Sequence, residues 1–304
     1  MAAAGCQTYT PAGKVLTAEQ KDFYYKNGYL VIRKCVPQAL LGRYADRFQA
    51  ICDGRVERSP GLVVMRDVAL KDGSGERAVN KIQDFYADET LFDYCRLPGV
   101  VAVVEDLIGG PNLMAMHTML INKPPDPGTK TSRHPMHQDM WYFPFRPAEA
   151  ICCAWTALEK VHRGNGCLVV VPGSQRTQLL KHGYPQWQGG VNKAYHGILD
   201  YDPAKEEQPR VHVEMEAGDT VFFHPLLIHG SGANKTNGFR KAISCHYANG
   251  SLCHYIDIAG TIQESIADEV EEMARKKYGR DIQLEFKDVW SVRGRVVKGL
   301  RANL

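Results

Sequence analysis

The segment of the sequence that is most informative about the fold is HPMHQDMWYFPF, at residues 134–145. Within it, His137 and Asp139 stand two positions apart, so on an extended strand both side chains leave the same face. An imidazole nitrogen and a carboxylate oxygen on one face suit a shared metal ion. The spacing alone is weak evidence, because 11 His and 34 acidic residues in 304 positions give about one such pair by chance.

A rival pair has the same spacing. His212 and Glu214 lie in an alternating run, so they too share one face of a strand. A third ligand from His224 or His229 would then lie within a single hairpin. We therefore interpret this pair as the solvated face of a strand.

A distant segment supplies a third ligand for the first pair. Residues 217–232, AGDTVFFHPLLIHGSG, are a turn, an apolar strand and His229 at a glycine-rich exit. Two histidines and one carboxylate on one face of a metal leave its other positions open, as in non-haem Fe(II) oxygenases. Eleven positions later, Arg240 begins an apolar run. Its planar guanidinium can hold a carboxylate with two parallel hydrogen bonds, which Lys cannot.

Composition restricts the classes of protein. A formal net charge of +3 without clustered basic runs argues against nucleic-acid binding. Nine cysteines without a Cys-x-x-Cys pair indicate reduced thiols inside a cell. No apolar run reaches the roughly 18 residues of a membrane span. A chain of 304 residues fits one large domain.

Hydrophobic periodicity and turn-forming residues divide this single domain, 1–304, into four parts. We expect a flexible start, N-terminal helices with a strand, a β core of short runs separated by Gly, Pro and Asn, and C-terminal helices. The boundaries are 1–15, 16–60, 61–255 and 256–304. This predicts a mainly β fold with flanking helices, an α+β arrangement built on a jelly roll.

Several elements are expected within these parts. Capping boxes at Thr17 and Thr261 open helices that end near Asn27 and at Gly279. Other expected elements are a strand at 29–32, a helix from Pro37, helix over 88–108 broken at Pro98, and a last helix over 286–297. Residues 173–210 lack a period, and we interpret this long connection as a lid or substrate wall.

From about Leu16 onward, the chain resembles the Fe(II)/2-oxoglutarate-dependent phytanoyl-CoA dioxygenase family. The matching segments, besides the two above, are VMRDV at 64–68, KIQDF at 81–85, MAMHTMLINKPP at 114–125, CAWTA at 153–157 and NGCLVV at 165–170. The resemblance implies a cupin-like double-stranded β-helix. It also implies Fe(II), 2-oxoglutarate and O2 as reactants, with ascorbate as reductant. The implied reaction is hydroxylation of carbon 2 of phytanoyl-CoA, or a related 2-methyl-branched acyl-CoA, in fatty acid α-oxidation.

The resemblance also assigns residues. His137, Asp139 and His229 are the implied metal ligands and catalytic residues, and the carboxylate of Asp139 favours hydroxylation over halogenation. Arg240 and Ser231 would hold the distal carboxylate of 2-oxoglutarate. Further cosubstrate residues are Lys81, Met119, Gln138 and Trp155. His117 and Gln138 are expected beside the ligands, with a packing role equally open for His117.

Other residues have plainer interpretations. His134 is expected beside the site or at the surface, and His224, His246 and His254 are expected to be structural. A basic rim of Lys123, Lys130, Arg133 and Arg146 either meets CoA phosphates or is merely solvated.

Three alternatives stay open: a hydroxylase of another substrate on the same fold, a non-catalytic barrel binding 2-oxoglutarate or another metabolite, and a cupin-type enzyme without 2-oxoglutarate. The ending Ala302-Asn303-Leu304 resembles a variant peroxisomal signal, with the cytoplasm as the alternative location. Expected partners are the acyl-CoA substrate, a lipid carrier protein and a peroxisomal import receptor.

Overall fold

Strand-forming sequence dominates the middle of the chain and folds into two antiparallel sheets. The computed structural model describes residues 15–304 except 67–74, 127, 129–131, 185, 188–189, 192–194, 203, 205–208 and 280–284. The larger sheet runs β1 (Tyr29–Ile32), β14 (Thr220–Phe223), β7 (Ile151–Ala157), β16 (Arg240–Asn249), β4 (Leu113–Lys123), β3 (Val79–Gln83) and β2 (Val63–Arg66), with β18 (Arg295–Lys298) on β4. The smaller sheet runs β13 (Val211–Val213), β8 (Leu168–Val170), β15 (His229–Ser231) and β5 (His134–His137).

The central strands of the larger sheet are buried on both faces. Because side chains alternate along a strand, Ala154 of β7 and Cys245 of β16 face the helices. Trp155 of β7 faces the smaller sheet and packs in one apolar cluster with Leu168 and Val170 of β8. The two sheets therefore form a jelly roll, which confirms the expected fold class.

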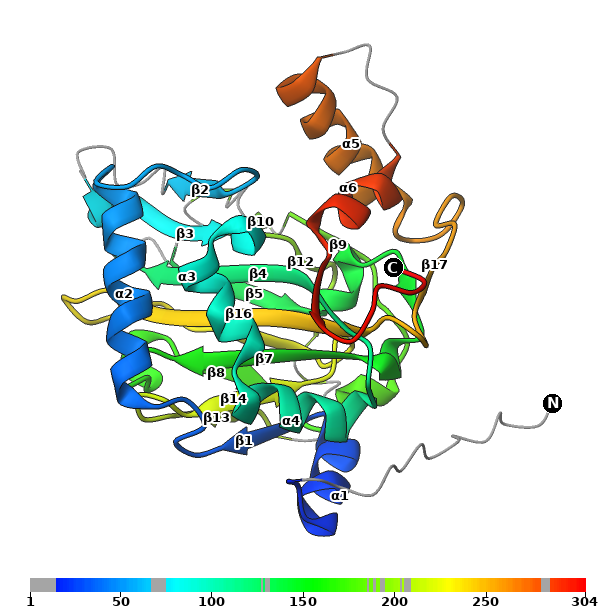
Figure 1. Cartoon of the computed structure of the whole chain (residues 1–304), viewed down its shortest axis with the longest axis horizontal. Helices are drawn as coiled ribbons and strands as arrows, with labels where there is room; N and C mark the ends of the chain where they lie inside the picture. The colour runs from blue at the N-terminus through cyan, green and yellow to red at the C-terminus, as the bar shows by residue number, and fades with distance from the viewer. Residues whose placement is uncertain are drawn as a thin grey trace.

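Helices cover the outer face of the larger sheet. α2 (Gln38–Cys52), α3 (Glu89–Phe92) and α4 (Pro98–Ile108) lie across it in Figure 1. Tyr44 and Phe48 of α2 join the apolar cluster that contains Phe222 and Ile243 of the sheet. α1 (Ala18–Asn27) precedes β1, while α5 (Glu264–Tyr278) and α6 (Phe286–Arg293) lie beyond the opposite edge. The helices therefore pack on the outer face of the larger sheet, and its inner face is turned toward the smaller sheet.

Short strand pairs complete the description. β9 (His182–Gly183) pairs with β12 (Gly197–Ile198), β10 (Gln186–Trp187) with β11 (Gly190–Val191), and β6 (Phe145–Arg146) with β17 (His254–Tyr255). The first two pairs lie within residues 173–210, part of which falls outside the described residues. The function of that connection as a lid or wall stays a prediction.

The N-terminal expectations are largely confirmed. Thr17 accepts a hydrogen bond from the Gln20 amide, and Gln20 returns the bond as a capping box. Pro37 caps α2 instead of starting it. The strand expected at 29–32 is present, and it joins the larger sheet beside β14. Residues 1–14 lie outside the described residues.

Two C-terminal expectations are wrong. α5 begins at Glu264 and not inside a capping box at Thr261, whose hydroxyl donates to the carbonyl of Ile258 at 2.6 Å. The last helix ends at Arg293, and residues 295–298 form a strand. This strand pairs with β4, whose N-terminal half offers a free edge there, so tertiary pairing overrides the helical pattern.

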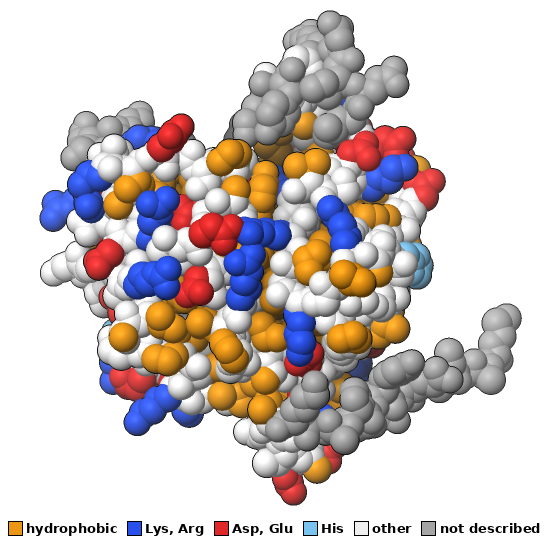
Figure 2. Space-filling model, viewed as in Figure 1, with side chains coloured by type: hydrophobic (Ala, Val, Ile, Leu, Met, Phe, Trp, Pro, Cys, Tyr) orange, Lys and Arg blue, Asp and Glu red, His pale blue; other side chains and the backbone are white. Residues whose placement is uncertain are grey.

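The visible face of the protein carries charges of both signs. Figure 2 shows basic and acidic side chains interspersed on the face that carries α2 and α4. All eight cysteines among the described residues are free thiols. Within the same described part of the chain, the helices are too short or too polar to span a bilayer.

Candidate metal and cosubstrate site

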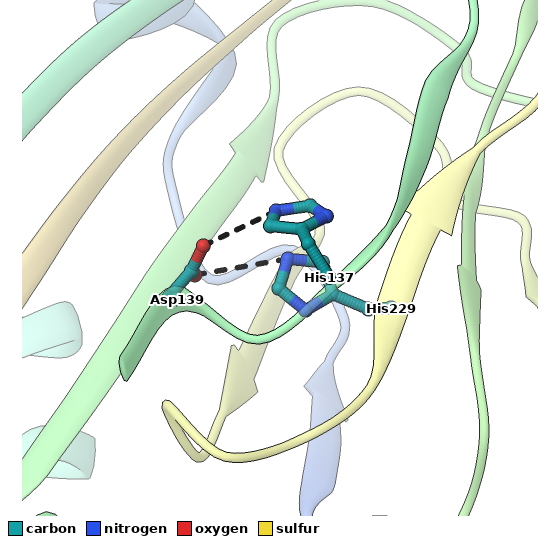
Figure 3. A group of neighbouring side chains, drawn as sticks. All are labelled: His137, Asp139 and His229. Atoms are coloured by element: carbon teal, nitrogen blue, oxygen red, sulfur yellow. Dashed lines mark ion pairs between the residues drawn. The ribbon is translucent and has the colours of Figure 1, made fainter. Parts of the chain in front are cut away.

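Three side chains meet between β5 and β15 of the smaller sheet. Antiparallel pairing sets His229 directly opposite His137. Asp139 follows two residues after His137, and Figure 3 shows the three side chains pointing toward one another. Nε2 of His137 lies 3.3 Å from Oδ1 of Asp139, and Nε2 of His229 lies 3.7 Å from Oδ2. All three side chains are buried, and their ligand atoms lie within 4.8 Å of one another.

The local backbone differs from the expectation in one respect. β5 ends at His137, and Asp139 is the first residue of a 3-10 turn, Asp139–Tyr142. Gln138 between them is still extended, at φ −121° and ψ 125°. The alternation of side chains therefore continues past the end of the strand and keeps both groups on one side.

Hydrogen bonds orient both imidazoles for metal binding. Nδ1 of His137 lies 2.9 Å from the carbonyl of Pro135, and Nδ1 of His229 lies 2.9 Å from that of Leu227. A carbonyl only accepts, so each Nδ1 carries a proton, which leaves Nε2 as the nitrogen that can bind a metal. Burial lowers the pKa of His229 to about 4, which keeps this ring neutral near pH 7. These donors suit a divalent first-row metal such as Fe(II).

A fourth side chain, His246 of β16, contacts this group. Its Nε2 lies 2.7 Å from Oδ2 of Asp139, and its ring is 1% exposed. Burial raises the pKa of Asp139, but His229 and His246 outweigh it and hold that pKa well below the usual range. The ionised carboxylate only accepts, so His246 is the donor.

The expectation that His246 is purely structural, for want of a partner carboxylate, is therefore wrong. Its partner is 107 positions away in the chain. Arg240, Ser244 and His246 alternate on β16 and line the same cavity as Asp139. This two-residue period is the signal in the sequence that could have identified His246.

Arg240 is a buried cation with unused donors. Its side chain is 2% exposed, its guanidinium lies 5.2 Å from the Trp155 ring centroid, and Nη2 donates to the carbonyl of Gly166 at 2.9 Å. Nε and Nη1 are buried without a partner among the described residues. Burial lowers the pKa of Arg240 to about 10, so the group remains charged near pH 7. A buried cation that has donor atoms without a partner among the described residues is suited to a carboxylate.

The structure gathers most of the expected cosubstrate residues in one cavity. Lys81, Met119, Trp155 and Ser231 line it together with Arg240 and the three metal-binding groups. Burial lowers the pKa of Lys81 to about 8. Ser244 also lines the cavity, and its hydroxyl is buried without a partner among the described residues.

Gln138 does not face this cavity. Its amide donates to the carbonyl of Leu226 at 3.0 Å and accepts from the Leu180 amide at 2.8 Å. This side chain holds the segment near residue 180 against the turn after β5, and its assignment as a cosubstrate residue stays a prediction. His117 does not line the cavity either, and its ring stacks on His246 with centroids 5.7 Å apart.

Other histidines follow the plainer interpretations. His212 and Glu214 are exposed, as expected for a solvated strand face. His134 stacks on His137 with centroids 4.0 Å apart and borders the cavity. His224 accepts a hydrogen bond from the Leu226 amide at 3.2 Å.

Two members of the expected basic rim are engaged elsewhere. Nζ of Lys123 is buried and donates to the carbonyls of Ser132 and Gly232. Arg146 donates to the carbonyls of Phe143 and Phe145 and to Gln263. Both groups therefore already bind other parts of the chain, and Lys130 lies outside the described residues.

Known proteins resemble this chain over nearly its whole length. A Caenorhabditis elegans protein named probable phytanoyl-CoA dioxygenase is 61% identical over 311 residues, covering 99% of each chain. The Mus musculus protein named phytanoyl-CoA dioxygenase, peroxisomal, is 58% identical over 299 residues, covering 97% of this chain and 87% of the mouse protein.

A solved structure shares the fold. The epimerase SnoN in complex with Fe3+, alpha ketoglutarate and nogalamycin RO superimposes with a TM-score of 0.60 at 22% identity. The match covers 79% of this chain and 86% of SnoN. The family model described as phytanoyl-CoA dioxygenase (PhyH) matches residues 24–242. With most of its length inside that match, the chain belongs to the phytanoyl-CoA dioxygenase family.

Proposed function

We propose that this protein is an Fe(II)- and 2-oxoglutarate-dependent dioxygenase that hydroxylates carbon 2 of phytanoyl-CoA or a related 2-methyl-branched acyl-CoA. The observation that carries the proposal is one cavity that combines two imidazoles, a carboxylate and a buried guanidinium, two donors of which have no partner among the described residues. The names of the relatives that are 61% and 58% identical support the substrate class.

The protein's own residues have defined roles in this proposal. His137, Asp139 and His229 would hold the iron through their imidazole and carboxylate groups. Arg240 would pair with the distal carboxylate of 2-oxoglutarate, beside the Ser231 hydroxyl, since its Nε and Nη1 have no partner among the described residues. When bound, iron and 2-oxoglutarate together with O2 supply the oxidising chemistry that hydroxylates an unactivated C–H bond.

The remaining walls position the reactants and exclude water. Met119, Trp155 and Phe223 provide apolar surface on the cavity. His246 donates to Oδ2 of Asp139 at 2.7 Å, and Oδ1 would remain available to bind a metal. Ascorbate would return oxidised iron to Fe(II), so we expect it to prolong turnover.

An anaerobic titration tests the cofactors. Fe(II) and 2-oxoglutarate added to the protein should produce a visible metal-to-ligand charge-transfer band, because the keto acid chelates the iron. A cupin-type enzyme that does not bind 2-oxoglutarate would give no such band, and that result would refute the proposal.

Turnover tests the substrate. Succinate release should rise on addition of phytanoyl-CoA and much less with straight-chain acyl-CoA or free acids, and the product should carry a hydroxyl on carbon 2. A charge-transfer band without succinate release from any acyl-CoA would identify a non-catalytic 2-oxoglutarate-binding barrel. Release with a different substrate alone would identify another hydroxylase of the same fold.

We also propose that the protein resides in peroxisomes, where an import receptor and a lipid carrier protein are its expected partners. Mammalian relatives carry the word peroxisomal in their names. Ala302-Asn303-Leu304 would need to undock before a receptor binds it, because Leu304 is 4% exposed and the Asn303 amide donates to Gly250 at 2.9 Å. Deleting residues 303–304 from a fluorescent fusion should therefore abolish punctate localisation. Unchanged import would show that another segment carries the signal.

A further inference from the structure

A second cavity, which we call the arginine cavity, borders the metal site. Its volume is about 980 Å³, and it shares the side chains of His134 and Ser231 with the metal-containing cavity. The charged side chains on its walls are Arg133, Arg163, Arg210 and Asp200. Three guanidinium groups against one carboxylate give the described walls a formal charge of +2.

These arginines come from three separate segments. Arg133 directly precedes β5, Arg163 begins the 3-10 turn Arg163–Asn165, and Arg210 directly precedes β13. All three line one cavity, so their positive charges converge on the same space. Burial lowers the pKa of Arg133, and Arg210 lowers it further. An anion bound in the cavity would be attracted by all three groups.

The cavity also has an apolar wall. Pro135, Met136, Ile198 and Leu199 lie on it, and the Arg210 guanidinium lies 5.5 Å from the ring centroid of Tyr201. A ligand with a polyanionic end and a neutral, partly apolar arm matches this combination of surfaces. An acyl-CoA has such a shape, with three phosphate groups at one end and a pantetheine arm leading to the thioester.

We propose that the arginine cavity binds the phosphates of the acyl-CoA substrate, with Arg133, Arg163 and Arg210 as the phosphate-binding groups. The shared wall at His134 and Ser231 then lets the pantetheine arm lead toward the metal site. This inference rests on the proposed function. It keeps Arg133 of the sequence-based rim and adds Arg163 and Arg210, because these three arginines line one cavity.

The test separates phosphate recognition from chemistry. The probes are free CoA and pantetheine, titrated anaerobically against the protein loaded with Fe(II) and 2-oxoglutarate. For turnover, phytanoyl-CoA is compared with S-phytanoyl pantetheine, which lacks the phosphates. The variants are Arg163→Gln, Arg210→Gln and the double substitution, with Arg43→Gln on the exposed side of α2 as matched control.

We expect each substitution to weaken CoA binding about tenfold, because each removes a charge-assisted contact to phosphate. The KM for phytanoyl-CoA should rise by a similar factor, while the KM for S-phytanoyl pantetheine and for 2-oxoglutarate should not change. Raising the salt concentration should weaken CoA binding to the parent protein more than to the double variant. The Arg43→Gln protein should match the parent throughout.

Each outcome decides a specific point. Unchanged CoA affinity and KM in the double variant would overturn this inference and leave the proposed function intact. An equal rise in KM for both thioesters would also overturn it, since the arginines would then act on something other than phosphate. Arginine-dependent CoA binding without turnover would support the phosphate site while refuting the proposed hydroxylation.

Discussion

Removing the hydrogen bond from His246 to Asp139 should weaken metal binding. The substitution His246→Phe keeps a ring of similar size beside Phe143, whose centroid lies 5.0 Å from that of His246, but it removes the donor at 2.7 Å. His246→Gln provides the matched rescue, because an amide nitrogen can take the place of Nε2. His254→Phe, at an exposed histidine, controls for the loss of an imidazole.

The size of the effect follows from burial and charge. A hydrogen bond to an ionised group contributes about 1.5–3 kcal/mol. Loss of the donor also raises the pKa of Asp139, so the incoming metal must displace a proton more often. Substitution of groups that orient metal ligands typically costs about 10- to 100-fold in metal affinity. We expect His246→Phe to fall in that range and His246→Gln to recover most of the affinity.

The measurement is a titration with Co(II), followed by its d–d absorption, and an anaerobic titration with Fe(II). Neither readout depends on turnover, and circular dichroism would verify that the variants fold. A parent-like dissociation constant for His246→Phe would refute the reasoning. It would mean that Asp139 is oriented by its own turn, and that His246 merely fills space.

Four further predictions concern the site and the fold. Arg240→Lys should raise the KM for 2-oxoglutarate about 10- to 100-fold, because a single ammonium group replaces the planar guanidinium. Lys241→Gln, on the other face of β16, is the control, and an unchanged KM in Arg240→Lys would show that Arg240 does not bind the 2-oxoglutarate carboxylate. Asp139→Ala should abolish succinate release and Co(II) binding, whereas Glu214→Ala in the exposed rival pair should leave both unchanged; the reverse pattern would relocate the metal. Adding Fe(II) at 100 times its dissociation constant should stabilise the fold by about 2.7 kcal/mol in a denaturation experiment, and an excess of chelator should cancel the gain. Burial lowers the pKa of His224 to about 4, so the unfolded chain binds more protons than the folded chain between pH 4 and 6.5. The free energy of unfolding should therefore fall by on the order of 3 kcal/mol as the pH drops through that window, and His224→Asn, which keeps an acceptor for the Leu226 amide, should reduce this dependence on pH.

Local sequence predicted the elements whose signals act over a few residues. The Thr17 capping box and the helix that ends before Gly28 depend on contacts within one turn. The metal pair was predictable because a two-residue spacing needs only an extended backbone between His137 and Asp139. Where a long-range contact competes, the same logic fails, and residues 295–298 pair with β4 instead of extending α6.

The resemblance to a family extended the prediction to residues far apart in the chain. The structure places these residues in the same cavity as the metal-binding group, and their roles toward a cosubstrate stay predictions; they are Lys81, Met119, Trp155, Ser231 and Arg240. The resemblance also named Gln138. Because side chains alternate along an extended backbone, the Gln138 side chain, between His137 and Asp139, points away from the side on which those two lie.

The amino-acid sequence specifies the metal-binding side chains, their local spacing and the strand pattern on which they lie. Which residues far apart in the chain come into contact follows from the tertiary structure. The pairing of β5 with β15 sets His229 opposite His137, the larger sheet brings His246 to Asp139, and three loops gather the arginines around one cavity. The reason is physical, since these contacts join residues roughly 30 to 110 positions apart, and sheet packing creates them where no local pattern encodes them.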